Sequence, residues 1–261
     1  MLDIFIVSLK SDLKRREVIS SFLINCGLHF DFIDAIYGKE IKDSDFLSLP
    51  LYTAESRLNR KLTHGEVGCT LSHLRVYNSI IEGDNDWVCI LEDDALLTPE
   101  FASFITSFDK DKLKLLPNNL YLLGGQNGIF QSRYIAKSRL TKINVGGVYF
   151  HKTIGSNNYI FRTCCYLMNK EMAAKIISLS KENFFVSDDW SYFSKLGIIK
   201  DIYLSDIVHH PLDLSGSHLE AERLVSFDDS SNSSQSCFHK IKWHFIHRLT
   251  LISSFFKTFM P

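Results

Sequence analysis

The chain has 261 residues, 45% of them hydrophobic, which is enough for one large α/β domain or two smaller ones. The 29 lysines and arginines nearly balance 30 aspartates and glutamates, so no overall field favours nucleic acid or an acidic polymer. The six cysteines form no CxxC pair, and no apolar stretch approaches the roughly 20 residues that span a bilayer, so we expect no disulfide framework, zinc site or membrane span.

The N-terminal third opens with a β-α-β pattern. Residues 2–9 (LDIFIVSL) form an apolar run typical of a strand, residues 13–27 have helical spacing and end at a glycine, and residues 28–36 alternate as a second strand. This order favours a parallel sheet, whose ligands bind at the carboxyl ends of the strands. The apolar run precedes the charges of "KSDLKRR", the reverse of a secretion signal, which predicts a cytoplasmic protein.

A polar stretch and a long helix follow. Residues 38–62 are irregular and predict short helices or a loop over the site. Residues 63–83 predict a helix in which Thr63 and Glu66 have the spacing of a capping box. Its apolar side excludes Ser72 and His73, which we expect on a different part of its surface.

The remaining elements alternate between strands and helices. Residues 87–91 (WVCIL) predict a buried strand, and Thr98 with Pro99 predicts the start of the next helix. The later segments are a strand at 118–125, a hairpin or mobile loop at 126–158, a strand, turn and helix at 158–180, a helix at 184–197 and a strand at 198–211.

The C-terminal segment differs from the rest of the chain. We divide the sequence into a domain of residues 1–225, a serine-rich linker of residues 226–236 and a helix of residues 237–261. The last segment holds four lysines or arginines, three histidines, many aromatics and no acid, which is typical of a helix lying on an anionic membrane surface. The alternative is a helix docked on the domain with its basic residues outward.

Three adjacent acids follow the strand at 87–91. Glu92 and Asp94 would lie on one side of an extended chain and Asp93 on the other. Like charges this close repel, and Mg²⁺ or Mn²⁺ takes oxygen ligands, so Glu92 and Asp94 are candidate metal and nucleotide ligands and Asp93 a hydrogen-bonding residue. The alternative is an acidic turn that caps the helix at Pro99.

Four blocks resemble glycosyltransferase family 25, a family with bacterial lipooligosaccharide galactosyl- and glucosyltransferases. They are "IFIVSLKSDLKRR", "FDFIDAIYGKEI", "LTHGEVGCTLSHLRVYNSII" and "ILEDDALLTPEF", in the order of the family. The resemblance implies a GT-A type fold, a Rossmann-like mixed sheet flanked by helices. It also implies a UDP-sugar donor, a divalent cation (Mn²⁺ or Mg²⁺) and inversion at the anomeric carbon.

The same resemblance assigns donor-binding roles. Ser8, Lys10 and Arg16 would border the uridine and diphosphate, and Ser72 and His73 would lie near the donor. Arg16 as a solvated helix residue, and His73 as a structural histidine, are the alternatives.

Later residues complete the expected site. Within "SDDW", Asp189 is slightly preferred to Asp188 as the catalytic base, with helix capping as the alternative. For a late metal ligand His209, His210 and His218 compete.

The sequence therefore predicts a metal-dependent hexosyltransferase that moves galactose or glucose from a UDP-sugar to a lipooligosaccharide core acceptor at the inner face of the cytoplasmic membrane. Two alternatives stay open: a haloacid-dehalogenase-like phosphatase, and a non-catalytic adaptor that binds nucleotide or membrane. The phosphatase chemistry needs an aspartate directly after the strand, where this chain has Glu92.

Overall fold

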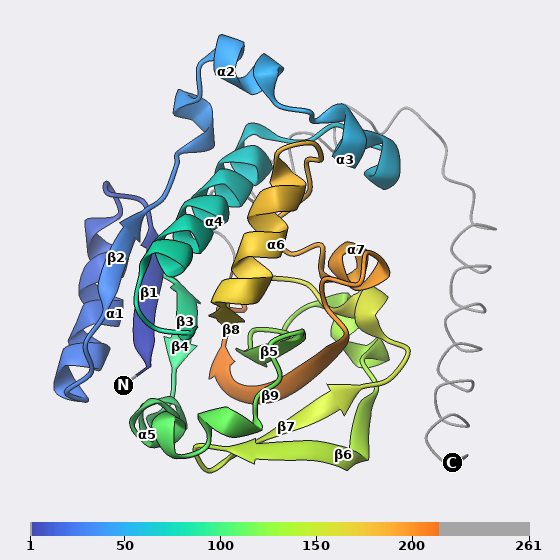
Figure 1. The fold of residues 1–261 in the computed structure, drawn as a ribbon. Helices are drawn as coiled ribbons and strands as arrows, with labels where there is room; N and C mark the ends of the chain where they lie inside the picture. Colours follow the sequence, from blue (N-terminus) through green and yellow to red (C-terminus); the bar gives the residue numbers. More distant parts are fainter. Residues whose placement is uncertain (1, 214–261) are drawn as a thin grey trace.

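The structure, a computed structural model, describes residues 2–213. The predictions for the linker at 226–236, the helix at 237–261 and His218 lie outside the described residues. Within this part of the chain one mixed sheet is flanked by helices on both faces, which confirms the predicted fold class. Figure 1 shows this arrangement.

The strands are β1 (Asp3–Ser8), β2 (Asp31–Asp34), β3 (Trp87–Glu92), β4 (Leu96–Leu97), β5 (Asn119–Gly124), β6 (Lys137–Val145), β7 (Val148–Thr153), β8 (Cys165–Asn169) and β9 (Asp201–His209). The α-helices are α1 (Leu13–Asn25), α2 (Asp43–Ser48), α3 (Tyr52–Leu58), α4 (His64–Glu82), α5 (Pro99–Ser107), α6 (Lys170–Ser180) and α7 (Trp190–Lys195). Short 3-10 turns lie at Gly38–Glu40, Phe108–Lys110, Lys112–Lys114, Phe130–Tyr134 and Asn157–Tyr159.

The sheet order is β2-β1-β3-β8-β5-β9-β7-β6, with β4 paired to β9. β1 is parallel to β2 and β3, whereas β8 is antiparallel to both of its neighbours, β3 and β5. β9 is parallel to β5. The carboxyl ends of β1, β2, β3, β5 and β9 therefore meet at one edge, together with the start of β8.

Side chains of the central strands alternate between two cores. In β3, Val88 and Ile90 pack on one face, while Cys89 and Leu91 pack on the other. Both faces are buried, so the strand reads as a continuous apolar run in the sequence.

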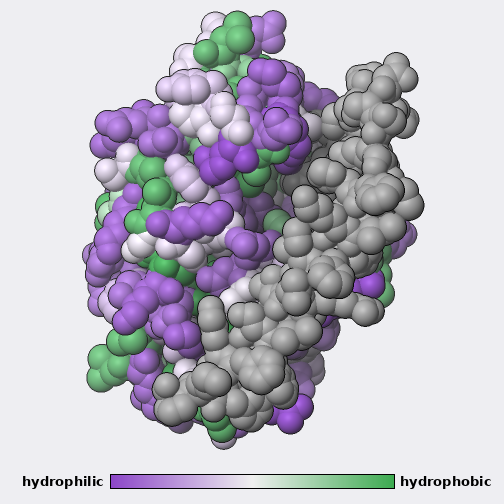
Figure 2. Space-filling model, turned by 90° about the vertical axis from the view of Figure 1, so that its right-hand side faces the viewer, coloured by the Kyte–Doolittle hydropathy of each residue, from purple (hydrophilic) through white to green (hydrophobic). Residues whose placement is uncertain are grey.

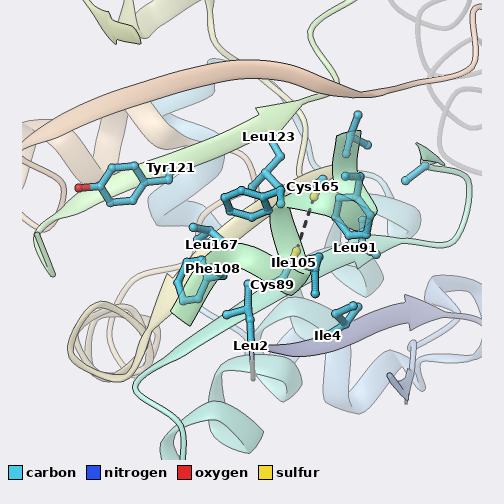
Figure 3. Close-up of a cluster of buried hydrophobic side chains, with 14 of the residues drawn as sticks. Leu2, Ile4, Cys89, Leu91, Ile105, Phe108, Tyr121, Leu123, Cys165 and Leu167 are labelled. Carbon is cyan, nitrogen blue, oxygen red and sulfur yellow. Dashed lines mark hydrogen bonds between the residues drawn. The ribbon is translucent and has the colours of Figure 1, made fainter. Parts of the chain in front are cut away.

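Helices α4, α6 and α7 cover one face of the sheet, and α4 and α6 run side by side across it (Figure 1). Helices α1 and α5, with the β6–β7 hairpin, cover the other. Figure 3 shows part of this second core, in which the Cys89 and Cys165 sulfurs lie 3.8 Å apart among leucine, isoleucine and aromatic side chains.

The predicted helix starts are confirmed in detail. The Thr63 hydroxyl accepts from Glu66 N at 3.1 Å and the Glu66 carboxylate accepts from Thr63 N at 3.1 Å, which completes the capping box of α4. Thr98 caps α5, with Pro99 in its first turn. Residues 38–62 hold short helices, and the segment 126–158 contains the β6–β7 hairpin.

One prediction about α4 is wrong. Ser72 and His73 are each only 1% exposed, because the helix buries them beside the sheet rather than leaving them on a separate surface. The Ser72 hydroxyl and His73 Nδ1 have hydrogen-bond partners, as buried polar groups usually do, whereas His73 Nε2 is buried without one.

The surface offers no broad apolar area in the view of Figure 2, where the described residues show hydrophobic side chains only in small separate groups. Among residues 2–213, no helix combines the length and the apolar character that crossing a bilayer requires.

Candidate active site

A cavity of about 200 Å³ lies where the carboxyl ends of the parallel strands meet. Five of the strands at this edge contribute residues at or next to their ends. These residues are Ser8 at the end of β1, Ala35 to Gly38 after β2, Glu92 at the end of β3 with Asp93 and Asp94 after it, Arg162 and Thr163 before β8, and His210 after β9. Helix α4 closes one side. The place matches that expected for a ligand site in an open α/β sheet.

Three side chains at this corner have the composition of a site for a hard cation. Glu92, Asp94 and His210 each bring a ligand atom to within 4.8 Å of the others. His210 Nε2 lies 3.8 Å from Asp94 Oδ2. Asp94 Oδ1 is buried without a hydrogen-bond partner, so the corner leaves an oxygen ready for a ligand. Two carboxylates and one imidazole fit Mn²⁺ or Mg²⁺.

The two acids of this corner have opposite pKa shifts. Burial and the neighbouring Glu92 charge raise the pKa of Asp94 to about 6, against the attraction of His210 and Arg15. Burial also disfavours the charged form of Glu92, but His73 and the Thr163 hydroxyl, which donates to its Oε1, hold the pKa of Glu92 below its ordinary value. Glu92 therefore stays ionised near neutral pH, whereas Asp94 gains a proton as the pH falls through about 6.

Asp93 points to a different set of partners, as its place in the alternation predicts. The Ser8 hydroxyl donates to Asp93 Oδ2 at 2.7 Å, and Arg15 Nη1 donates to Oδ1 at 3.0 Å. Burial raises the pKa of Asp93 although both contacts oppose it. Arg15 also lies 3.6 Å from Asp94 and lines the cavity.

Lys10 and Arg16, the basic residues expected to border the donor, lie outside the cavity wall. Arg16 Nη2 donates to Asp34 Oδ1 at 2.7 Å and to Ser8 O at 2.9 Å, and Lys10 is an exposed residue 3.7 Å from Asp34. Neither residue is part of the cavity wall. Arg15, which was not predicted as a site residue, does line the cavity. Consecutive helix residues point about 100° apart, so only one of the two arginines faces the corner.

Ser72 and His73 both border the cavity but do different things. The Ser72 hydroxyl donates to Gly68 O at 2.6 Å and accepts from Ile36 N at 2.8 Å, so it fixes the loop after β2. His73 Nδ1 is 2.8 Å from the Tyr166 hydroxyl. Its Nε2 is buried without a hydrogen-bond partner and lies 3.6 Å from Glu92 Oε1.

The adjacent Asp188 and Asp189 side chains lie in different surroundings. Asp188 lines the cavity, and its Oδ2 accepts from Arg162 N at 2.8 Å. Asp189 caps α7 by accepting from Tyr192 N and pairs with Arg57 at 2.9 Å, outside the cavity wall. Asp188 is therefore the one of the two that lines the cavity, whereas the carboxylate of Asp189 is used by the helix cap and the ion pair.

The late histidines are separated by the end of β9. His209 is the last residue of β9 and is exposed, while His210 is buried and faces Asp94. Asn127 accepts from His210 N at 2.9 Å, which fixes the backbone there. Of the described histidines that competed for this role, His210 is therefore the one placed beside the acids.

The sequence profile of glycosyltransferase family 25, described as an LPS biosynthesis protein family, matches residues 1–191. The chain belongs to glycosyltransferase family 25. One relative is procollagen galactosyltransferase 1-B of Xenopus laevis. It is 34% identical to this chain over a segment that covers 35% of this chain and 16% of the relative. A glycosyltransferase 25 family member of Aedes aegypti is 25% identical over 67% of the chain and 27% of its own length.

A Haemophilus influenzae protein with a provisional glycosyltransferase name is 24% identical over 84% of the chain and 76% of its own length. The chain thus spans less than a third of the length of each of the two animal relatives, from Xenopus laevis and Aedes aegypti. The profile match includes Glu92, Asp94 and Asp188, but ends before His210.

Proposed function

We propose that this protein transfers a hexose, galactose or glucose, from a UDP-sugar to a saccharide acceptor in the cavity at the sheet edge. The observation that carries the proposal is the placement of Glu92, Asp94 and His210 beside Asp188 in one cavity. Membership of a glycosyltransferase family supports the reaction class.

Glu92, Asp94 and His210 would hold Mn²⁺ or Mg²⁺. When bound there, such a cation would offset the negative charge that develops on a departing diphosphate. Arg15 supplies a further positive charge on the same side, held between Asp93 and Asp94. Asp93 fixes that arginine and is itself held by the Ser8 hydroxyl, so both residues would contribute to donor binding through Arg15.

Asp188 is the proposed catalytic base. Its carboxylate would take the proton of the acceptor hydroxyl as that oxygen forms a bond to the anomeric carbon. The bond from the anomeric carbon to the diphosphate oxygen breaks with its electron pair leaving on UDP, and attack from the opposite side inverts the centre. Arg162 N donates to Asp188 Oδ2 and so helps to hold the carboxylate at the cavity wall.

The proposed acceptor is a lipooligosaccharide core at the inner face of the cytoplasmic membrane. The lipopolysaccharide description of the family supports it, and the basic aromatic segment 237–261 would bring the chain to that surface. Co-sedimentation with anionic vesicles, compared between the full chain and one ending at residue 236, tests the membrane contact: equal binding by both would exclude the segment as the anchor.

The test of the function is a donor screen that measures UDP release from UDP-Gal, UDP-Glc and their N-acetyl forms. We expect turnover of at least one donor with Mn²⁺ or Mg²⁺, and a loss of about 100-fold or more in EDTA or in Asp94→Ala, because both remove the charge balance at the diphosphate. Full activity in EDTA would contradict the proposal.

A phosphatase assay and a UDP-binding measurement, run beside the donor screen, separate the alternatives. Release of phosphate from p-nitrophenyl phosphate would favour the phosphatase, and UDP binding without turnover of any donor would favour the adaptor. The strand end carries Glu92 in the position where the phosphatase chemistry needs an aspartate, which argues against the first of these.

A further inference from the structure

A second group of metal-ligating side chains lies on the α4 side of the acidic corner. Cys69 and His73 are one turn apart on α4 and project from the same side of the helix. With Glu92 at the end of β3, each brings one ligand atom to within 4.8 Å of the other two. All three line the cavity, so an ion from solvent has a route to them.

The orientation of His73 is the second observation that points to a ligand. The ring is 1% exposed, and Nδ1 is held 2.8 Å from the Tyr166 hydroxyl, which lies 3.0 Å from the Tyr77 hydroxyl. If Nδ1 carries the proton and donates it to Tyr166, Nε2 has a lone pair that can bind a metal, 3.6 Å from Glu92 Oε1. That nitrogen is buried and has no hydrogen-bond partner. A histidine held at one nitrogen by an outer partner is the usual arrangement at metal sites.

We propose that Cys69, His73 and Glu92 bind Zn²⁺. One sulfur, one nitrogen and one oxygen suit this borderline-soft ion and leave a fourth position open. The neighbouring group of Glu92, Asp94 and His210 has no sulfur and suits a harder cation. On binding, the Cys69 sulfur exchanges its proton for the metal and the proton goes to solvent.

The two candidate metal sites share one ligand, Glu92. Glu92 belongs to both groups, so Zn²⁺ at Cys69 and His73 competes with a hard cation for the same carboxylate. Cysteine spacing does not predict this zinc site, because two of its three ligands, Cys69 and His73, are close in sequence and the third, Glu92, comes from a separate strand. The zinc proposal does not depend on sugar transfer.

Cobalt is the spectroscopic probe for this site. Co²⁺ added to the full-length chain with Cys26→Ser and Cys237→Ser should give a near-ultraviolet thiolate-to-cobalt band that Zn²⁺ abolishes. Cys26→Ser removes an exposed thiol at the end of a different helix, and Cys237→Ser removes a thiol that is close to several histidines in the sequence. Adding Cys69→Ser should abolish the band and weaken zinc binding about tenfold or more. Adding Asp94→Asn, as the matched control for the neighbouring group, should leave the band in place.

A second measurement avoids reliance on the variant's folding. In the unmodified chain, Zn²⁺ should slow alkylation of Cys69, measured by mass spectrometry of its peptide, and should leave the exposed Cys26 unchanged. A cobalt band that survives Cys69→Ser, or a Cys69 alkylation rate that does not respond to Zn²⁺, would overturn the proposal.

Discussion

Asp94 lies near two carboxylates, one imidazole and one guanidinium, and its pKa, raised to about 6, reflects the cost of ionising it there. The unfolded chain ionises this residue at a lower pH, near its ordinary value of 3.8. Between these values the folded state binds more protons than the unfolded state, so this residue's contribution to stability decreases as the pH rises through the window. Above about pH 6 the loss is complete.

This linkage predicts that Asp94→Asn stabilises the metal-free protein. In EDTA at pH 7.5 the free energy of unfolding should increase by about 1–3 kcal/mol, because the variant lacks the buried negative charge. At pH 4 the gain should largely disappear. Urea unfolding at the two pH values measures it, with the exposed Asp84→Asn as control. A gain of equal size at both pH values would contradict the assignment.

Asp188 and Asp189 allow a matched pair of substitutions. Asp188→Asn should lower kcat about 100-fold or more with little effect on stability, because it removes the proposed base from the cavity. Asp189→Asn should mainly lower the free energy of unfolding, by about 1 kcal/mol, because it weakens a partly buried ion pair to Arg57. Steady-state kinetics and urea unfolding of both variants measure this. The reverse pattern would return the base to Asp189.

For individual residues, the sequence identifies the acidic side chains of the site better than the basic ones. The carboxylates after an apolar strand stand out because their repulsion needs an explanation. Arg15 and Arg16 are adjacent cations on α1, and only the rotation of α1 against the sheet decides which of the two faces Asp93. That rotation comes from packing, which no local pattern records.

Helix α4 forms one side of the cavity because it approaches the loop after β2 very closely. A Cβ on Gly68 would lie 2.7 Å from Ile36 O and 2.8 Å from Gly38 N, both backbone atoms that cannot move alone. The same approach brings Ser72 within hydrogen-bond distance of Ile36 N. The glycine thus sets the distance between the helix and the cavity wall.

Gly68→Ala should lower the free energy of unfolding by about 2–4 kcal/mol, because the steric cost exceeds the helix preference of alanine. The matched control is Gly83→Ala at the end of the same helix, where the nearest atom to a Cβ is 3.3 Å away. That variant should be within about 0.5 kcal/mol of the original chain. Equal stability of the two variants in urea unfolding would show that the contact is not tight in solution.

Element boundaries follow well from the sequence, and sheet order follows less well. Apolar runs, the capping box of α4 and the proline of α5 mark their elements directly. The antiparallel insertion of β8 between β3 and β5, and the two-residue β4, are set by contacts between distant segments. Such contacts leave no periodic pattern in either segment.

In the described molecule, one edge of the sheet gathers residues that lie far apart in the chain. Ser8, Glu92, Thr163 and His210 belong to different segments, yet parallel β1, β3 and β9, and the reversed β8, bring them to one cavity. The cores on both faces make the sheet a rigid support for this corner. Function therefore depends on sheet topology as much as on the acidic motif itself.

Binding of UDP measured by calorimetry, with and without Mn²⁺, tests the central claim most directly. In the presence of Mn²⁺ we expect UDP to bind to the original chain, and we expect Asp94→Asn or EDTA to weaken that binding about tenfold or more, since the acidic corner would hold the cation that contacts the diphosphate. UDP binding of unchanged affinity in EDTA and in Asp94→Asn would contradict the account.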